Sequence, residues 1–219
     1  MISMDIAKTG KEKQLTYTTE YRQFNKAMKE EFYLEAVAIG YAIIEDRLIA
    51  FLHHAGIITR TKEELKMNRM IYPYIRKLLN KDEKYSVRIK NISVKIDLIT
   101  ALLNMTEMEA SDIDTYVSNY VQGLKRKRSI AQAGFMQDLY TELRKVNEKL
   151  VLSSFGKIEP WRKQRNQLIH ALLNKTVESA KDAKKLCAEE SYEITREIDN
   201  YLVKPFKKDN KLRKKYNIQ

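Results

Sequence analysis

Apolar residues recur at intervals of three and four positions along most of the chain, which is typical of amphipathic helices that bury one face. The first such segment begins near Thr18, runs through a long apolar stretch and ends at Gly56. Glycine commonly ends helices because it adopts positive φ freely. We expect this segment to be the central helix of the core.

Four further helices follow from the same pattern. Thr61 and Glu64 have capping-box spacing and predict a short helix that is interrupted or bent at Pro73. The remaining helices are expected from Asp112 or Asp114 to about Leu152, with candidate breaks at Gly123 and Gly134; from Lys157 to Leu173, with Pro160 in the first turn; and from Val177 to Phe206. Ser153 to Gly156 is expected to be a loop.

The segment from Tyr85 to Leu103 fits two patterns. Between Val87 and Leu98 apolar residues alternate as in a strand, whereas over the whole segment they also form a helical stripe. A lone strand would have no sheet to join, so we favour a helix and keep a strand at 85–98 as the alternative.

These segments predict an all-α bundle of about five to seven helices. The length of 219 residues fits one domain, which we place at residues 18–203, between an N-terminal arm at 1–17 and a basic tail at 204–219. Six glycines and three prolines are too few for a turn-rich β-sandwich or barrel. The chain contains no internal repeat.

The cysteine content and the lengths of the apolar stretches limit the cellular compartment and the kinds of partner that we expect. A single cysteine, Cys187, forms no internal disulfide and offers no thiol cluster, so we expect a cytoplasmic protein without a metal site or cofactor. The longest apolar stretch, Ala36 to Ile44, is far shorter than a membrane-spanning helix, and Met1 to Gln14 lacks the apolar core of a signal peptide. We therefore expect no membrane association.

Positive charge is concentrated at two places. Lysine and arginine number 41 against 29 acidic residues, for a net charge of +12. The run Lys125, Arg126, Lys127, Arg128 contributes four positive charges, and residues 204–219 hold seven basic side chains and one acid. Such clusters are expected where a protein contacts a phosphate backbone, so we predict that Lys125 to Arg128 bind RNA. A solvated helix face and a disordered tail are the alternative interpretation.

Residues 159–174 carry the chain's most unusual combination of side chains. On a helical wheel of about 100° per residue, Trp161, Leu168 and Leu172 share one apolar face, and Arg165 falls near the centre of that face. A guanidinium there is costly unless it is paired, reaches an interface or lines a cleft. Asn166 and His170 lie four positions apart at the margin and can approach each other.

Two interpretations of these residues are open. Arg165 can bind a phosphate through two nitrogens while His170 transfers protons near neutral pH. Alternatively, the stem of Arg165 packs along apolar surface and His170 caps or packs locally. The adjacent His53 and His54 point in different directions on a helix and are not a chelating pair.

At these residues the chain resembles the HEPN superfamily, whose ribonuclease members carry an arginine, a polar residue, three further positions and a histidine. Here these are Arg165, Asn166 and His170, on a late helix that follows a long upstream helix containing Glu45. The resemblance implies a helical bundle that dimerises so that two such motifs face one another. It also implies a metal-independent endoribonuclease, in which Arg165 contacts the scissile phosphate, His170 transfers a proton and Asn166 orients one of them.

One departure from the family concerns its toxin branch, which pairs with a nucleotidyltransferase antitoxin. There a tyrosine, the target of modification, usually stands two residues after the histidine, whereas this chain has Leu172. Control by that route is therefore not expected, although an antitoxin or regulatory protein remains a candidate partner.

Glu45 falls on the apolar face of the first core helix, between the directions of Tyr41, Ile49 and Leu52. We hypothesise that Glu45 pairs with Arg165 and holds its guanidinium toward the cleft. Pairing of Glu45 with Arg47 or with a surface lysine is an equal alternative.

The leading functional prediction is a homodimeric ribonuclease that acts as a toxin or antiviral defence effector. The alternatives are an inactive HEPN-like module that binds RNA or a partner protein, and an unrelated helical scaffold with a basic surface. Which copy of His170 acts as acid or base, and which RNA is cut, do not follow from the sequence.

Overall fold

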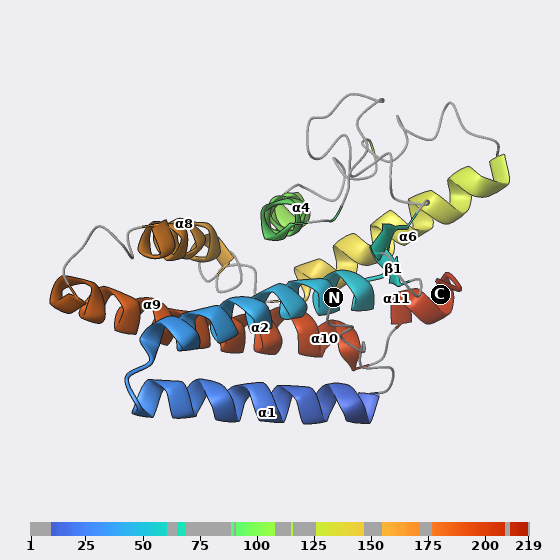
Figure 1. The fold of residues 1–219 in the computed structure, drawn as a ribbon. Coiled ribbons are helices and arrows are strands. Elements are labelled where there is room, and N and C mark those ends of the chain that lie inside the picture. The colour runs from blue at the N-terminus through green and yellow to red at the C-terminus, as the bar shows by residue number, and fades with distance from the viewer. Residues whose placement is uncertain are drawn as a thin grey trace. The chain divides into compact units, whose positions relative to one another are not determined.

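The computed structural model describes residues 10–60, 65–68, 89, 91–107, 115, 126–146, 155–170, 177–208 and 211–218. Within these ranges the fold is predominantly α-helical, which confirms the predicted class (Figure 1). The helices are α1 (Gly10–Lys29), α2 (Tyr33–His54), α4 (Ile92–Asn104), α6 (Arg126–Arg144), α8 (Ile158–His170), α9 (Val177–Ile198), α10 (Lys204–Lys207) and α11 (Lys211–Lys215). Two short strands, β1 (Ile58–Arg60) and β2 (Leu65–Met67), pair antiparallel with Ile58 opposite Met67.

The chain forms two compact units. The first unit comprises Met1–Asp46 and Pro160–Thr195, and the second comprises Arg47–Glu159 and Arg196–Gln219. The candidate catalytic segment on α8 belongs to the first unit, and the C-terminal lysines belong to the second. The two units are therefore described separately.

The single helix expected from Thr18 to Gly56 is wrong, because the chain turns between α1 and α2. Glu31 adopts a left-handed φ of 61°, the amide of Phe32 donates to the carbonyl oxygen of Ala27 at 2.8 Å, and that of Glu31 donates to Met28 at 3.3 Å. These two bonds form a Schellman-type helix end, which usually carries glycine or asparagine at the left-handed position. Because glutamate occupies this position here, the sequence contains no residue that signals the end of a helix.

Helix α1 also begins earlier than predicted. Residues 10–17, which were assigned to an N-terminal arm, form its first two turns. The side-chain hydroxyls of Thr16 and Thr18 donate to carbonyl oxygens four residues earlier in the same helix.

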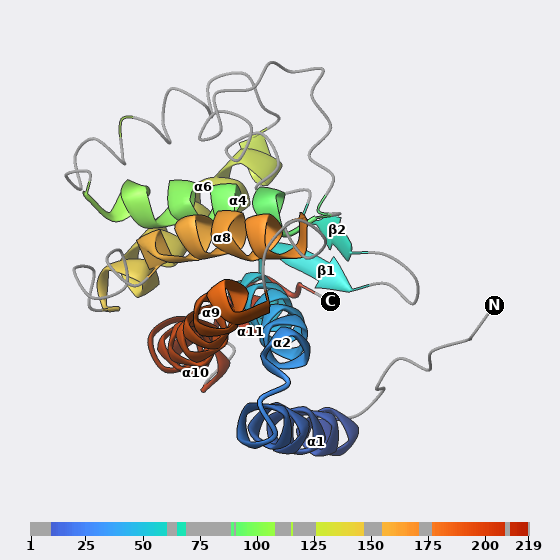
Figure 2. The ribbon, with the colours of Figure 1, turned by 60° about the vertical axis from the view of Figure 1, so that its left-hand side comes forward.

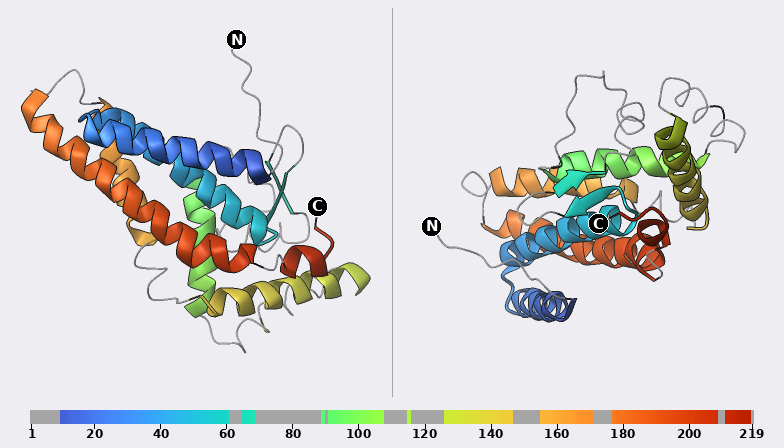
Figure 3. Two further views of the ribbon diagram at one scale, coloured as in Figure 1. Left: turned by 90° about the horizontal axis from the view of Figure 1, so that it is seen from below. Right: turned by 90° about the vertical axis from the view of Figure 1, so that its right-hand side faces the viewer.

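The core of the first unit lies where α1, α2 and α9 meet, and these helices run side by side in Figures 2 and 3. Gly40 on α2 faces Ser191 on α9, so closely that a Cβ atom at Gly40 would clash with the Ser191 hydroxyl. Phe24 on α1 is buried beside them, and its ring stacks on Tyr192 at a centroid distance of 5.9 Å. The absent side chain of Gly40 therefore allows α2 and α9 to approach.

In the second unit, a β-hairpin follows α2 where a short helix was expected. Gly56 adopts a φ of 74°, and the side-chain amide of Asn68 donates to its carbonyl oxygen at 2.9 Å. The backbone amide of Asn68 donates to Ile57 at 2.8 Å, so both ends of the hairpin are tied to the end of α2. The helix predicted to open at Thr61 is wrong, because Leu65–Met67 is a strand; Pro73 lies outside the described residues.

The favoured helix in the ambiguous segment is confirmed where the structure describes it. Helix α4 begins after Asn91, whose side chain accepts a hydrogen bond from the amide of Val94 at 3.0 Å and caps the helix. Its buried apolar residues recur at helical spacing, as in Ile92, Ile96, Ile99 and Leu103. Most of residues 85–90 lie outside the described ranges.

Helices α6 and α8 lie within the ranges predicted for them, and the predicted helix start at Asp112 or Asp114 and the residues from 171 to 173, Leu172 included, lie outside the described residues. Gly134 lies inside α6 and does not break it, whereas Gly123 and residues 147–154 lie outside the described ranges. Phe155, expected in a loop, is helical and buried, because its ring joins the core just before α8.

The C-terminal residues, expected to form a tail, build part of the second unit. Helix α9 continues through a π-helical turn, Asp199–Val203, into α10, which contains Pro205 in its first turn. Phe206 packs edge-on against Phe51 at 5.2 Å, and Leu212 on α11 is 4% exposed. These apolar contacts bring residues 204–208 and 211–218 into the packed structure. No helix among the described residues has the length and apolar character that a membrane crossing requires.

We expect Gly40→Ala to lower the free energy of unfolding by about 1–3 kcal/mol, because the added Cβ would lie 2.7 Å from the Cβ of Ser191. Adding Ser191→Gly should recover part of that loss, which urea unfolding of the two single variants and the double variant measures. Gly156→Ala is the matched control, since no heavy atom lies within 4 Å of its added Cβ. Equal stability of Gly40→Ala and Gly156→Ala would contradict the close approach.

Candidate active site

Helix α8 carries the arginine–asparagine–histidine segment, and its buried face is the one that the helical wheel predicts. Trp161 and Leu168 are 2% and 7% exposed. Arg165 and Asn166 are half-buried, whereas His170, the last described residue of the helix, is exposed to solvent. The segment therefore offers one partly desolvated cation and one accessible imidazole.

The guanidinium of Arg165 is held in place by two neighbours. Its Nη1 donates a hydrogen bond to Oδ1 of Asn166 at 2.9 Å. Its Cζ lies 4.2 Å from the centroid of the Tyr41 ring, close enough for a cation–π interaction. Tyr41 comes from α2, so the contact joins the two helices within the first unit.

Tyr41 is supported in turn by Trp161. Their ring centroids lie 6.3 Å apart, with an angle of 26° between the ring planes. The indole Nε1 of Trp161 donates to the carbonyl oxygen of Cys187 on α9 at 2.8 Å. Guanidinium, phenol and indole thus form a stack, here called the Arg165 stack, whose base is fixed to the backbone of α9.

One buried donor atom of Arg165 is not satisfied. Its Nε is buried and has no hydrogen-bond partner among the described residues. A buried donor without an acceptor costs about 1–3 kcal/mol. An oxyanion such as a phosphate is the type of ligand that arginine nitrogens bind, and it would supply the missing acceptor once the side chains that cover Nε move aside.

The charges around Tyr41 place Glu45 in the same region. Burial and the charge of Glu45 raise the pKa of Tyr41, while Arg165 and Arg162 act in the opposite direction. Both Glu45 and Arg165 are therefore within electrostatic reach of the phenol. The direct Glu45–Arg165 ion pair stays a prediction, because the contacts that define the position of Arg165 are those with Asn166 and Tyr41.

The alternative partner proposed for Glu45 belongs to another cluster. Arg47 forms an ion pair with Asp199 at 3.0 Å, and both residues lie in the second unit. Burial lowers the pKa of Arg47, and the hydrogen bond to Asp199 partly offsets that effect.

The predicted RNA-binding residues are described only in part. Lys125 lies outside the described residues, and Arg126, Lys127 and Arg128 form the first turn of α6. Their role stays a prediction.

The neighbouring rings of His53 and His54, at the end of α2, meet edge to face at 5.5 Å. In the part of the chain that is described, no three His, Cys, Asp or Glu residues are grouped as metal ligands would be.

Sequence reasoning missed Tyr41 as a neighbour of Arg165. Its aromatic side chain lay in a helix rich in apolar residues and looked like any core residue. Tyr41 is identified by its stacking against Arg165, which lies 124 positions later in the chain. That contact exists only when α2 and α8 pack together, so it leaves no local pattern in the sequence.

The chain matches no protein-family model, no curated protein and no solved structure.

The Arg165 stack predicts energetic coupling between Tyr41 and Arg165. A double-mutant cycle of Tyr41→Leu and Arg165→Met is expected to give a coupling of about 0.5–2 kcal/mol, because either change alone removes the cation–π contact. Unfolding can be followed by the fluorescence of Trp161, the only tryptophan. A second cycle with Tyr41→Phe, which keeps a ring, should show little coupling, and additive effects in the first cycle would contradict the stack.

Packing of α8 on α9 also predicts an inert thiol. Burial, followed by the charge of Glu190, raises the pKa of Cys187 to about 11. At pH 8 the thiolate fraction is then roughly a hundredfold below that of an ordinary cysteine. Ellman's reagent should react slowly with the native protein at pH 8. The reaction should become faster as the pH rises toward 11, or when the protein is unfolded in guanidinium. Equal rates for the native and the unfolded protein at pH 8 would refute this prediction.

Proposed function

We propose that this protein is a metal-independent endoribonuclease of HEPN type that acts as a homodimer. The observation that carries the proposal is the state of Arg165: its guanidinium is fixed by Tyr41 and Asn166 while its buried Nε has no acceptor among the described residues. The exposed His170 lies on the same helix, five positions after Arg165, and would supply the proton-transfer group.

RNA supplies its own nucleophile for this reaction. A base removes the proton of a ribose 2′-hydroxyl, the 2′-oxygen bonds to the adjacent phosphorus, and the bond from phosphorus to the 5′-oxygen breaks as an acid protonates the leaving oxygen. The products are a 2′,3′-cyclic phosphate and a 5′-hydroxyl. Arg165 would stabilise the charge that develops on the phosphate oxygens.

The reaction needs one base and one acid, whereas each chain offers one histidine in the segment. A two-fold dimer would supply a second His170 and a second Arg165 across a shared cleft. Asn166, which already accepts a hydrogen bond from Arg165, would orient the guanidinium. Under this proposal the protein works in the cytoplasm as a toxin or antiviral effector, with an antitoxin or regulatory protein as a further partner.

One observation favours a second candidate, an inactive HEPN-like module that binds RNA or a partner protein. Arg165 already has two intramolecular partners, and its Nε is covered, as expected of an arginine that stabilises the packing of α2 on α8. In that case His170 would tolerate substitution.

The test is to incubate the purified protein with single-stranded and structured RNA in EDTA and to analyse the ends of the products. Wild type is expected to leave 2′,3′-cyclic phosphates, and Arg165→Ala or His170→Ala to lower the rate by about 10²–10⁴-fold. Lys163→Ala is the matched control, because Lys163 is an exposed cation on the same helix.

Three outcomes separate the candidates. Loss of cleavage in the two variants with retained activity in Lys163→Ala supports the proposal. RNA binding without cleavage by any form supports the inactive module. Equal cleavage by all forms would show that Arg165 and His170 do not carry the reaction.

A further inference from the structure

The last two helices of the second unit present a dense set of lysines on an anchored backbone. Six side chains of α10, α11 and the residue after α10 are exposed, and together they are called the lysine face: Lys204, Lys207, Lys208, Lys211, Lys214 and Lys215. Phe206, Leu212 and Arg213 of the same stretch are buried. The segment is thus amphipathic, with its apolar residues committed to the core and its ammonium groups in solvent.

Several contacts fix the backbone beneath the lysine face. Arg213 Nη1 donates to the carbonyl oxygen of His53 at 3.0 Å and to that of Ile58 at 3.2 Å, across the end of α2 and the start of β1. The hydroxyl of Tyr216 donates to Asp138 on α6 at 2.7 Å. Because these contacts already order the backbone of α11, a ligand would not have to order it there, which lowers the entropic cost of binding.

Acidic side chains neutralise only part of the lysine face. Lys204 pairs with Asp199 at 3.4 Å, and Lys215 pairs with Asp138 at 2.6 Å. Burial raises the pKa of Asp138, but hydrogen bonds from Lys215 and Tyr216 outweigh it, so the net pKa is lowered and the carboxylate stays charged. Lys207, Lys208 and Lys214 take no part in the ion pairs found among the described residues.

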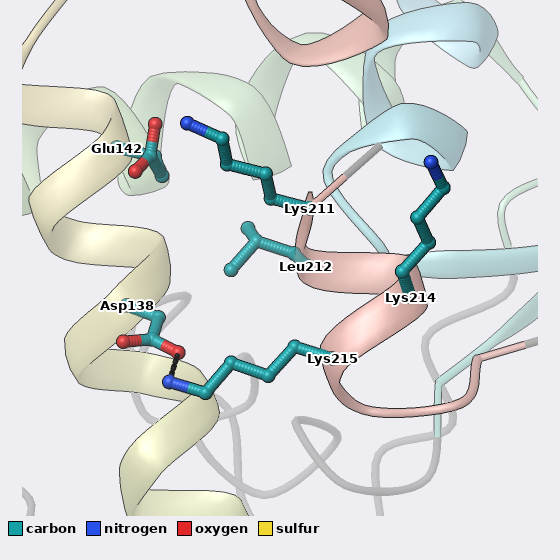
Figure 4. A pocket seen from close by; sticks show the side chains of 6 residues that line it. All are labelled: Asp138, Glu142, Lys211, Leu212, Lys214 and Lys215. Atoms are coloured by element: carbon teal, nitrogen blue, oxygen red, sulfur yellow. Dashed lines mark ion pairs between the residues drawn. The ribbon is translucent and has the colours of Figure 1, made fainter. Parts of the chain in front are cut away.

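A groove of about 670 Å³ runs between α6 and α11, lined by Asp138, Glu142, Lys211, Leu212, Lys214 and Lys215 (Figure 4). Lys215 extends across it to Asp138, whereas Lys214 points away from the two carboxylates. One ion pair, Lys215–Asp138, thus spans the groove, whereas Lys214 lines it with its ammonium group directed away from the carboxylates.

We propose that the lysine face is a binding site for the phosphate backbone of RNA, contacted through Lys207, Lys208 and Lys214. Ammonium groups on flexible stems bind successive phosphates without reading bases. An anionic membrane surface is the poorer fit, because such helices insert large apolar side chains, and α10 and α11 expose none. The large apolar side chains that are exposed in the described residues, Leu15, Phe32, Leu186 and Tyr192, belong to the first unit. The choice of RNA as the polyanion rests on the proposed function.

The test is the binding of a fluorescein-labelled, fully 2′-O-methylated RNA oligonucleotide, followed by anisotropy between about 50 and about 200 mM KCl. This probe lacks the nucleophilic hydroxyl, so the measurement does not depend on cleavage. The triple variant Lys207→Gln, Lys208→Gln, Lys214→Gln should bind more weakly at low salt. The slope of log affinity against log salt should become shallower by about 2, at roughly 0.7 per phosphate contact to a single strand.

The matched control is the triple variant Lys11→Gln, Lys29→Gln, Lys157→Gln, which removes three exposed lysines from other helical segments and has the same net charge. It should keep the salt slope within about 1 of wild type. A Lys→Arg triple at 207, 208 and 214 should retain binding, and circular dichroism verifies that every variant is folded.

The proposal would be overturned by equal weakening in both glutamine triples, or by unchanged binding in the triple at 207, 208 and 214. Preference for phosphatidylserine vesicles over the oligonucleotide would also overturn it and assign the face to a membrane. If the oligonucleotide binds through the lysine face but no RNA is cut, the ribonuclease proposal fails while this one stands.

Discussion

The close approach of α2 and α9 at Gly40 and Ser191 is the constraint on which the candidate site depends. Ser191 lies one helical turn after Cys187, whose carbonyl oxygen holds the indole of Trp161. Tyr41, the neighbour of Gly40, stacks on that indole and supports Arg165. A side chain at Gly40 would separate α2 from α9 and so displace the phenol from the indole beneath it. The absence of a side chain at Gly40 on α2 thus helps to position the guanidinium of Arg165 on α8.

The second unit is ordered by a different device, the return of the C-terminus to the end of α2. The final carbonyl groups of a helix need hydrogen-bond donors, and Arg213 donates to that of His53. Its positive charge also interacts favourably with the partial negative charge at the C-terminal end of α2. Gly56, at a φ of 74°, leaves room for Phe135 and Ile218. Residues that look like a charged tail therefore complete a helix end, and the lysines around them acquire fixed positions as a consequence.

The sequence predicted what depends on local periodicity and missed what depends on packing. The wheel correctly buried Trp161 and Leu168, and helical spacing correctly outweighed alternation in α4. The turn at Glu31 was missed because its left-handed φ is held by bonds to Ala27 and Met28 rather than by a glycine. The β-hairpin and α11 were missed for a related reason, since both are stabilised by distant partners that a local pattern does not contain.

The environment of Arg165 limits how a phosphate could be bound. One nitrogen of the guanidinium already donates to Asn166, and its Nε is covered. A phosphate that is bound through Nε must gain access to a covered atom, whereas one that is bound end-on through Nη1 and Nη2 shares Nη1 with Asn166. His170 lies at the end of α8, one turn beyond Asn166. Under the proposed function, Asn166 would therefore influence anion binding through its hydrogen bond to Nη1, one helical turn before the imidazole.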